Sequence, residues 1–168
     1  TREATTLNNM GGVYSELGDR QKALDYYQQA LLLHQAVGNR AGEANTLNNI
    51  GSAYADLGDF QQALDYYQQV LSLARSVSDR AEEATALNNI GSVYSDLGDN
   101  QKALDYYQQA LPLYQAIGDR SGEAIILTSI GSVYFDLGEK QQALDYYHQA
   151  LPLRREVGDR SGEAGKCY

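Results

Sequence analysis

Asparagine side chains recur in pairs along the sequence, and their amides are suited to hold the backbone of an extended peptide. The pairs are Asn8-Asn9, Asn48-Asn49 and Asn88-Asn89, and Thr128-Ser129 replaces them in the last copy. An amide offers two N–H donors and a carbonyl acceptor, so a row of amides can bind peptide backbone with little dependence on the peptide's side chains. Asparagine is a mediocre helix former, and its repetition inside a helical pattern therefore needs an explanation. Two explanations stay open: a binding surface, or solvated polar positions copied by duplication.

Other residues that carry chemistry lack the partners that catalysis or metal binding requires. His34 and His148 are far apart and have no matching column of cysteines or histidines, so we predict surface helix positions and no metal site. Asp25 and its copies recur because the whole unit recurs, which favours a solvated role over paired general acids. The sequence contains no serine, histidine and carboxylate arrangement and no phosphate-binding glycine loop. We therefore expect a protein that is not an enzyme and needs no cofactor.

Charge and composition disfavour several classes of partner. The chain has 168 residues, 43% of them hydrophobic, and a net charge of −9. That charge disfavours a nucleic-acid or anionic-membrane surface and favours basic or neutral partners. No apolar run approaches the roughly 18 residues of a membrane span. Cys167 is the only cysteine, so no intramolecular disulfide can form. This fits a reducing compartment, and we predict a cytoplasmic protein.

A forty-residue repeat determines the elements that carry these side chains. Strings close to LNNIGSVYSDLGDNQKALDYYQQAL begin at Leu7, Leu47, Leu87 and Leu127. Within each copy, apolar residues recur at three- and four-residue spacing in two stretches, which predicts two amphipathic helices. The glycine between them suits the left-handed residue after a helix, and the acidic residue after it suits the N-cap of the next helix. The predicted helices span 3–17, 20–37, 41–57, 60–77, 81–97, 100–117, 121–137 and 140–157.

Four positions test this all-α interpretation. Pro112 and Pro152 lie inside second helices, where each removes a backbone donor and is expected to kink its helix. Ser78 replaces the glycine of the other turns, which is expected to make this turn slightly less favourable. A further short helix is expected to begin near Ser161. At the helix contact, small residues such as Gly11 are expected to permit close approach while tyrosines fill the adjoining space.

These residues resemble those of the tetratricopeptide repeat (TPR) family over about residues 1–160. The family pattern, W-x2-L-G-x2-Y then A-x3-F then P, falls in the third copy on Leu87, Ile90, Gly91, Tyr94, Ala103, Tyr107 and Ala110. Leucine replaces the tryptophan, tyrosine replaces the phenylalanine, the closing proline is absent, and the period exceeds the usual length of about 34 residues. This longer form is similar to the arrays of kinesin light chains, Pins-type adaptors and bacterial TPR proteins.

The resemblance implies an α-solenoid of four helix-turn-helix units that forms a right-handed superhelix. The units are repeats 1–40, 41–80, 81–120 and 121–160, which together make a single TPR array over 1–160, and residues 161–168 are a truncated repeat start or tail. Family members bind peptides or protein segments on an inner wall built from the first helix of each repeat. The implied function is therefore a protein-protein interaction scaffold.

The positions of that wall define the candidate peptide-binding residues of this chain. They are Asn8, Asn9, Glu16, Asn45, Asn48, Asn49, Ser52, Asp56, Asn88, Asn89, Ser92, Asp96, Ser129, Ser132 and Asp136. The carboxylates among them imply a mild preference for basic or neutral ligands. The positions at which some family members clamp a chaperone tail hold no cation here, which disfavours that partner. Alanine at Asn49 and Asn89 is expected to abolish binding and to leave thermal stability roughly intact.

The alternative is a structural spacer or a self-association module. Terminal repeats of such arrays usually carry a polar outer face. Here Leu144, Tyr147 and Leu151 are expected to be partly exposed where a fifth unit would stack, which favours end-to-end stacking of chains.

Overall fold

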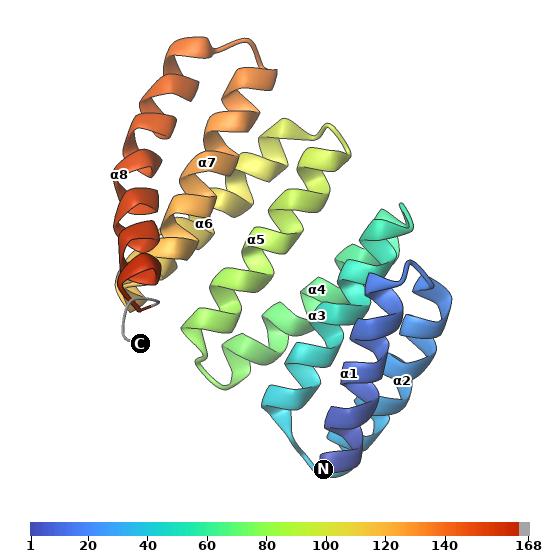
Figure 1. The fold of residues 1–168 in the computed structure, drawn as a ribbon. Coiled ribbons are helices and arrows are strands. Elements are labelled where there is room, and N and C mark those ends of the chain that lie inside the picture. Colours follow the sequence, from blue (N-terminus) through green and yellow to red (C-terminus); the bar gives the residue numbers. More distant parts are fainter. Residues whose placement is uncertain (165–168) are drawn as a thin grey trace. The chain divides into compact units, whose positions relative to one another are not determined.

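Eight α-helices account for the fold of residues 1–164, whose backbone the computed structural model describes; side chains are described as far as Gly158. The helices follow one another in antiparallel pairs (Figure 1). They are α1 Arg2–Glu16, α2 Arg20–Ala36, α3 Arg40–Asp56, α4 Phe60–Ser76, α5 Arg80–Asp96, α6 Asn100–Ile117, α7 Arg120–Asp136 and α8 Lys140–Ala164. No strand occurs in this part of the chain. The bounds of the first seven helices confirm the predicted ones to within one residue, and α6 and α8 continue past Pro112 and Pro152.

The eighth helix is longer than the sequence indicates. It continues to Ala164 instead of ending near residue 157, and no separate helix begins at Ser161. The reason is that Gly158 lies within the helix and lacks the positive φ of the turn glycines. Glycine permits the left-handed conformation but does not require it. Residues 165–168, with Cys167, lie outside the described residues.

The turns between helices are specified locally. Glycines with positive φ follow a helix at Gly18, Gly38, Gly58, Gly98, Gly118 and Gly138. Ser78 adopts the same backbone conformation with φ of 56°, at a steric cost that glycine does not have. The residue that follows the turn caps the next helix: Asp19 Oδ1, for example, accepts from the backbone N–H of Lys22 at 3.2 Å. The predicted glycine turns and N-caps are thus confirmed.

Within each pair, the two helices approach closely because a glycine faces a tyrosine ring. A Cβ built on Gly51 would lie 2.6 Å from Cε1 of Tyr67. Beside this contact Tyr54 of α3 stacks on Tyr66 of α4, with ring centroids 5.5 Å apart. The same stack joins Tyr14 to Tyr26, Tyr94 to Tyr106 and Tyr134 to Tyr146. The prediction that small residues permit close approach and tyrosines fill the adjoining space is confirmed.

The chain divides into two compact units, residues 1–86 and 87–168. In the first unit α2 stacks on α3, and Leu24 shares one buried cluster with Ile50 and Ala53. In the second unit α6 lies against α7, and α7 against α8. A second helix stacked on the first helix of the next repeat therefore builds each unit, as expected of an α-solenoid. That all four repeats form one array and one superhelix stays a prediction.

Candidate peptide-binding surface

The asparagines of the first unit bond to one another across neighbouring first helices. Asn49 Nδ2 on α3 donates to Asn8 Oδ1 on α1 at 3.1 Å, and Asn8 Nδ2 donates to Asn45 Oδ1 at 3.3 Å. One repeat further along, Asn48 Nδ2 donates to Glu82 Oε1 on α5. Part of the amide row therefore joins the first helices, which explains asparagines inside a helix. The expectation that alanine at Asn49 leaves stability intact is revised, because this change removes the bond to Asn8.

The amide row changes character in the second unit. Asn88 Nδ2 donates to the neighbouring Asn89 Oδ1 at 3.4 Å. In the last copy, Thr128 Oγ1 donates to the backbone carbonyl of Ala124 at 2.7 Å and accepts from Arg154 Nη2 at 3.2 Å. A threonine hydroxyl that bonds to its own helix has less capacity for a ligand than an amide has. That these columns bind peptide backbone stays a prediction.

The serines after the helix-contact glycines bond to tyrosine hydroxyls of the second helices. Ser132 Oγ lies 3.2 Å from Tyr147 Oη. Ser52 bonds to Tyr67 in the same way: burial raises the pKa of Tyr67 to about 12, with the serine bond opposing this rise and the Asp56 carboxylate adding to it. These partners were not identified from the sequence, although the constant spacing between the serine and tyrosine columns was a usable signal. The serine side chains remain exposed and accessible to a ligand.

The carboxylates of the first helices are of two kinds. Asp56 Oδ2 pairs with Arg20 Nε of the preceding repeat at 2.9 Å, so its charge is compensated within the protein. Glu16, Asp96 and Asp136 are exposed and form no ion pair with any described residue. The surface is thus more acidic at these three positions than at the paired one.

A junction is the contact between the second helix of one repeat and the first helix of the next. At the first junction His34 is only 4% exposed, and its Nδ1 lies 3.0 Å from Asn39 Nδ2. Its ring covers Gly42, since a Cβ built there would lie 2.2 Å from the ring. The predicted surface position of His34 is therefore wrong, because the residue falls on the side of α2 that stacks on α3. Burial lowers the pKa of His34, with the Glu43 carboxylate opposing this effect.

The other two junctions have different residues at the positions equivalent to His34 and Gly42. At the third junction Tyr114 covers Gly122, with 2.2 Å between its Cδ1 and a Cβ built on that glycine. At the middle junction Ala74 stands in the place of the ring and Glu82 in the place of the glycine. A ring at the first of these positions thus goes with glycine at the second, whereas alanine at the first position goes with glutamate at the second. This reciprocal change is visible in the sequence and identifies the contact.

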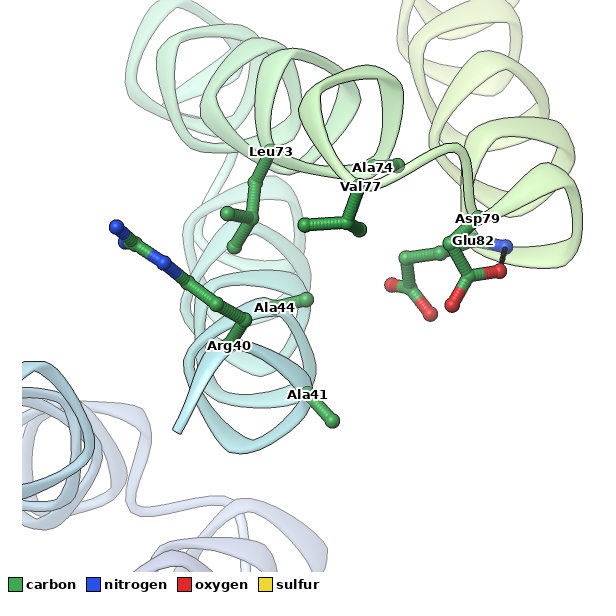
Figure 2. A pocket seen from close by; sticks show the side chains of 8 residues that line it. All are labelled: Arg40, Ala41, Ala44, Leu73, Ala74, Val77, Asp79 and Glu82. Atoms are coloured by element: carbon green, nitrogen blue, oxygen red, sulfur yellow. Dashed lines mark hydrogen bonds between the residues drawn. The ribbon is translucent and has the colours of Figure 1, made fainter. Parts of the chain in front are cut away.

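The middle junction contains a hollow of about 280 Å³, which Figure 2 shows. Its apolar part is formed by Ala41, Ala44, Leu73, Ala74 and Val77. Three charged residues line the rest: Arg40, Asp79 and Glu82. In Figure 2 the guanidinium of Arg40 extends away from the side on which the two carboxylates lie. The hollow therefore combines an apolar floor with one acidic side.

The two carboxylates of the hollow are held by their neighbours. Asp79 Oδ1 accepts from the backbone N–H groups of Ala81 and Glu82, both at 3.1 Å. Burial raises the pKa of Glu82, the Asp79 carboxylate adds to the rise, and the bond from Asn48 opposes it. On the other side, Arg40 Nη1 pairs with Glu43 at 2.9 Å. The net charge that faces the hollow is consequently negative.

The described part of the chain offers neither a metal site nor a membrane span. Among these residues, no group of three or more His, Cys, Asp or Glu side chains is arranged to hold a metal ion. No helix of this part is long and apolar enough to cross a membrane.

Several solved structures share the fold. BtubC (BKLC) from P. vanneervenii is 23% identical with a TM-score of 0.82, and the match covers 92% of this chain and 64% of that one. Aspartyl phosphate phosphatase F from Bacillus subtilis is 17% identical with a TM-score of 0.89, over 94% of this chain and 42% of that one. A Rap protein complexed with competence and sporulation factor is 20% identical with a TM-score of 0.85, over 95% and 44%. The chain therefore spans less than two thirds of each, and the likeness concerns the fold alone.

Sequence comparison gives the family. No curated protein sequence matches this chain significantly. A model of the tetratricopeptide repeat family, in contrast, matches residues 2–76 and 82–156, which is most of the chain. The protein is a member of the tetratricopeptide repeat family.

Proposed function

We propose that this protein is an interaction scaffold that holds an extended segment of a partner along its first helices, with a preference for basic residues. The observation that carries the proposal is the acidic row of the second unit, the exposed carboxylates of Asp96 and Asp136 on the first helices, which the packing of the described residues does not use. Glu16 is the equivalent exposed carboxylate of the first unit. Exposed serines, Ser92 and Ser132, lie one turn before Asp96 and Asp136. Hydroxyls and carboxylates are the acceptors that peptide N–H groups and basic side chains require.

Two further facts support the proposal. The family to which the chain belongs builds scaffolds that bind protein segments, and a Rap protein of the same fold is complexed with competence and sporulation factor. The net charge of −9 makes the field around the chain attractive to cations. The amides contribute less than the sequence indicates, because several of them bond to one another.

A charge-matched pair of variants tests the acidic row. D96K/D136K reverses two carboxylates of the first helices, and D105K/D145K reverses two exposed carboxylates of the second helices with the same change in net charge. Peptides selected by the wild-type protein from a random display library should bind about tenfold more weakly to D96K/D136K, since each exposed charge pair contributes up to about 1 kcal/mol. They should bind equally well to D105K/D145K. Equal losses in both variants, or no loss in either, would contradict the proposal.

We also propose, as a second candidate, that copies of the chain associate end to end. Met10 and Val13 of α1 are 38% and 55% exposed, whereas Ile50 and Ala53 at the same positions of α3 are at most 1% exposed. Leu144 of α8 is likewise 50% exposed. These faces are the two halves of a junction such as α2 forms with α3. Each would therefore be covered by the complementary face of another copy.

A concentration series tests this second candidate. Light scattering between low and high micromolar concentration should show a rising mean mass for the wild-type protein. Lysine at Leu144 should abolish the rise, whereas lysine at the exposed, polar Gln141 on the same helix should not. A mass that stays that of one chain at every concentration would contradict end-to-end association.

A further inference from the structure

We infer that the hollow at the middle junction is a pocket for one basic side chain, a lysine or an arginine, of the segment that the scaffold binds. The inference rests on the proposed function for the presence of a segment, and it adds the point at which that segment is anchored. The pocket lies between α3, α4 and the first turn of α5, and Asn48 of the asparagine row bonds to its wall through Glu82.

The size and floor of the hollow suit a single long side chain. Its volume of about 280 Å³ is slightly below the range of about 300–1,000 Å³ in which pockets for drug-sized ligands fall. The floor consists of three alanines with Leu73 and Val77, so it offers apolar surface and no polar group. Lysine and arginine lay their methylene stems along such surface while the charged head stays with polar partners. Glutamate or aspartate would bring its charge to the acidic side and be repelled.

The acidic side has capacity for the charged head. Asp79 and Glu82 use Oδ1 and Oε1 for the bonds described above, and Oδ2 and Oε2 make no hydrogen bond to any described residue. Arg40 does not compensate them, because it pairs with Glu43 and extends to the opposite side (Figure 2). Glu82 is half-buried and Asp79 is exposed beside it. The two neighbouring carboxylates repel each other, and a cation between them removes that repulsion.

The other two junctions provide a matched control. The corresponding space is taken by the ring of His34 at the first junction and by the ring of Tyr114 at the third. The third junction also has an aspartate, Asp119, at the position of Asp79. The double variant A74Y/E82G therefore gives the middle junction the residues of the third, which fills the pocket with a packing arrangement that this fold already contains.

The pocket can be tested with compounds of one residue each. Nα-acetyl-lysine methylamide is titrated into the chain while the methyl resonances of Ala44 and Ala74 are followed by NMR. The expected result is a saturable shift of both methyl groups. Nα-acetyl-norleucine methylamide, which has the stem without the charge, should bind about fivefold more weakly, as loss of a charge pair of up to about 1 kcal/mol implies.

Variants locate the binding. D79N/E82Q removes both charges but keeps the N-cap and the acceptor for Asn48, and it should weaken the lysine compound to the level of the norleucine compound. A74Y/E82G should abolish binding. Equal binding of the two compounds to the wild-type protein, or unchanged binding of the lysine compound to D79N/E82Q, would overturn the inference.

The outcome separates this inference from the proposed function. The D96K/D136K variant should bind the lysine compound as the wild-type protein does, because neither position lines the pocket. If the lysine compound binds while no library peptide does, the pocket stands and the proposed function fails. If library peptides bind through the acidic row while the lysine compound shifts neither methyl group, the proposed function stands and the pocket inference is wrong.

Discussion

At the third junction Tyr114 covers Gly122, whereas at the middle junction Ala74 faces Glu82 beside a hollow of about 280 Å³. The first junction resembles the third, because a histidine ring covers a glycine there. The residue pairs of the three junctions stand at equivalent positions of equivalent helices, so the backbone alone does not decide between a filled contact and an open one. The pair of side chains decides it. A repeat can thus exchange packing for a charged pocket at a single position pair.

The largest loss of stability should come from a substitution at a junction that an aromatic ring fills. Leucine at Gly122 would place side-chain atoms inside the ring of Tyr114 and should lower the free energy of unfolding by about 1–3 kcal/mol or more. Leucine at Gly12 is the control, because a Cβ there meets only the Tyr27 hydroxyl at 3.9 Å. Denaturant unfolding of the two variants should separate them clearly. Similar losses in both would mean that the ring over Gly122 is not tightly packed.

A double-mutant cycle sharpens the comparison at the middle junction. Tyrosine at Ala74 alone should collide with Glu82. Glycine at Glu82 alone should cost about 1 kcal/mol of stability in helix propensity and should also remove the hydrogen bond from Asn48. Combined, the two changes should be less destabilising than their sum by about 0.5–3 kcal/mol, as for residues in direct contact. Urea unfolding of the four proteins measures this coupling. Strict additivity would show that the two columns do not meet as described.

The amide bond between the first helices α1 and α3 offers a smaller effect. Alanine at Asn49 removes the donor to Asn8 and should lower the free energy of unfolding by about 0.5–1.5 kcal/mol. Alanine at Asn9 is the matched control, since this exposed side chain makes no hydrogen bond to a described residue. Thermal unfolding followed by circular dichroism suffices. A variant at Asn49 as stable as the wild-type protein would show that the bond contributes nothing.

The smallest expected effect is a pH dependence of the stability, which the histidine at the first junction causes and the tyrosine at the third does not. Burial holds the pKa of His34 below its ordinary value, so the unfolded chain binds more protons than the folded one as the pH falls from 7.5 to 5.5. The stability that neutral His34 contributes is complete above the unfolded pKa and is lost as the pH falls toward the folded pKa. H34Y, which copies the tyrosine–glycine contact of the third junction, lacks this component. Unfolding curves at both pH values should show a greater loss for the wild-type protein; equal losses would contradict a buried neutral histidine.

The elements were predictable from the sequence because local signals specify them. The glycine turns, the aspartate caps and the apolar spacing gave seven helices to within a residue. The end of α8 was not predictable, because Gly158-Asp159 has the residue types of the earlier turns but lies within the helix. The burial of His34 cannot be predicted from its own repeat, because it depends on the glycine that the next repeat has eight residues later.

The candidate site was predictable only in part. The family pattern identified the polar rows, but which members bond to each other depends on distances between different repeats. The bonds of Asn49 to Asn8 and of Asp56 to Arg20 connect residues more than thirty positions apart. The pocket arises from a size exchange between Ala74 and Glu82, which no single repeat reveals.

The most direct test compares binding and stability at the middle junction in one variant. The affinity of a lysine-containing peptide selected from a random library is measured by calorimetry for the wild-type protein and for A74Y/E82G, together with their melting temperatures. The variant should bind about tenfold more weakly, because one charge pair and its apolar floor are lost, and should melt at the same temperature or higher. Unchanged affinity at unchanged stability would contradict the central claim that this junction serves recognition while the other two serve packing.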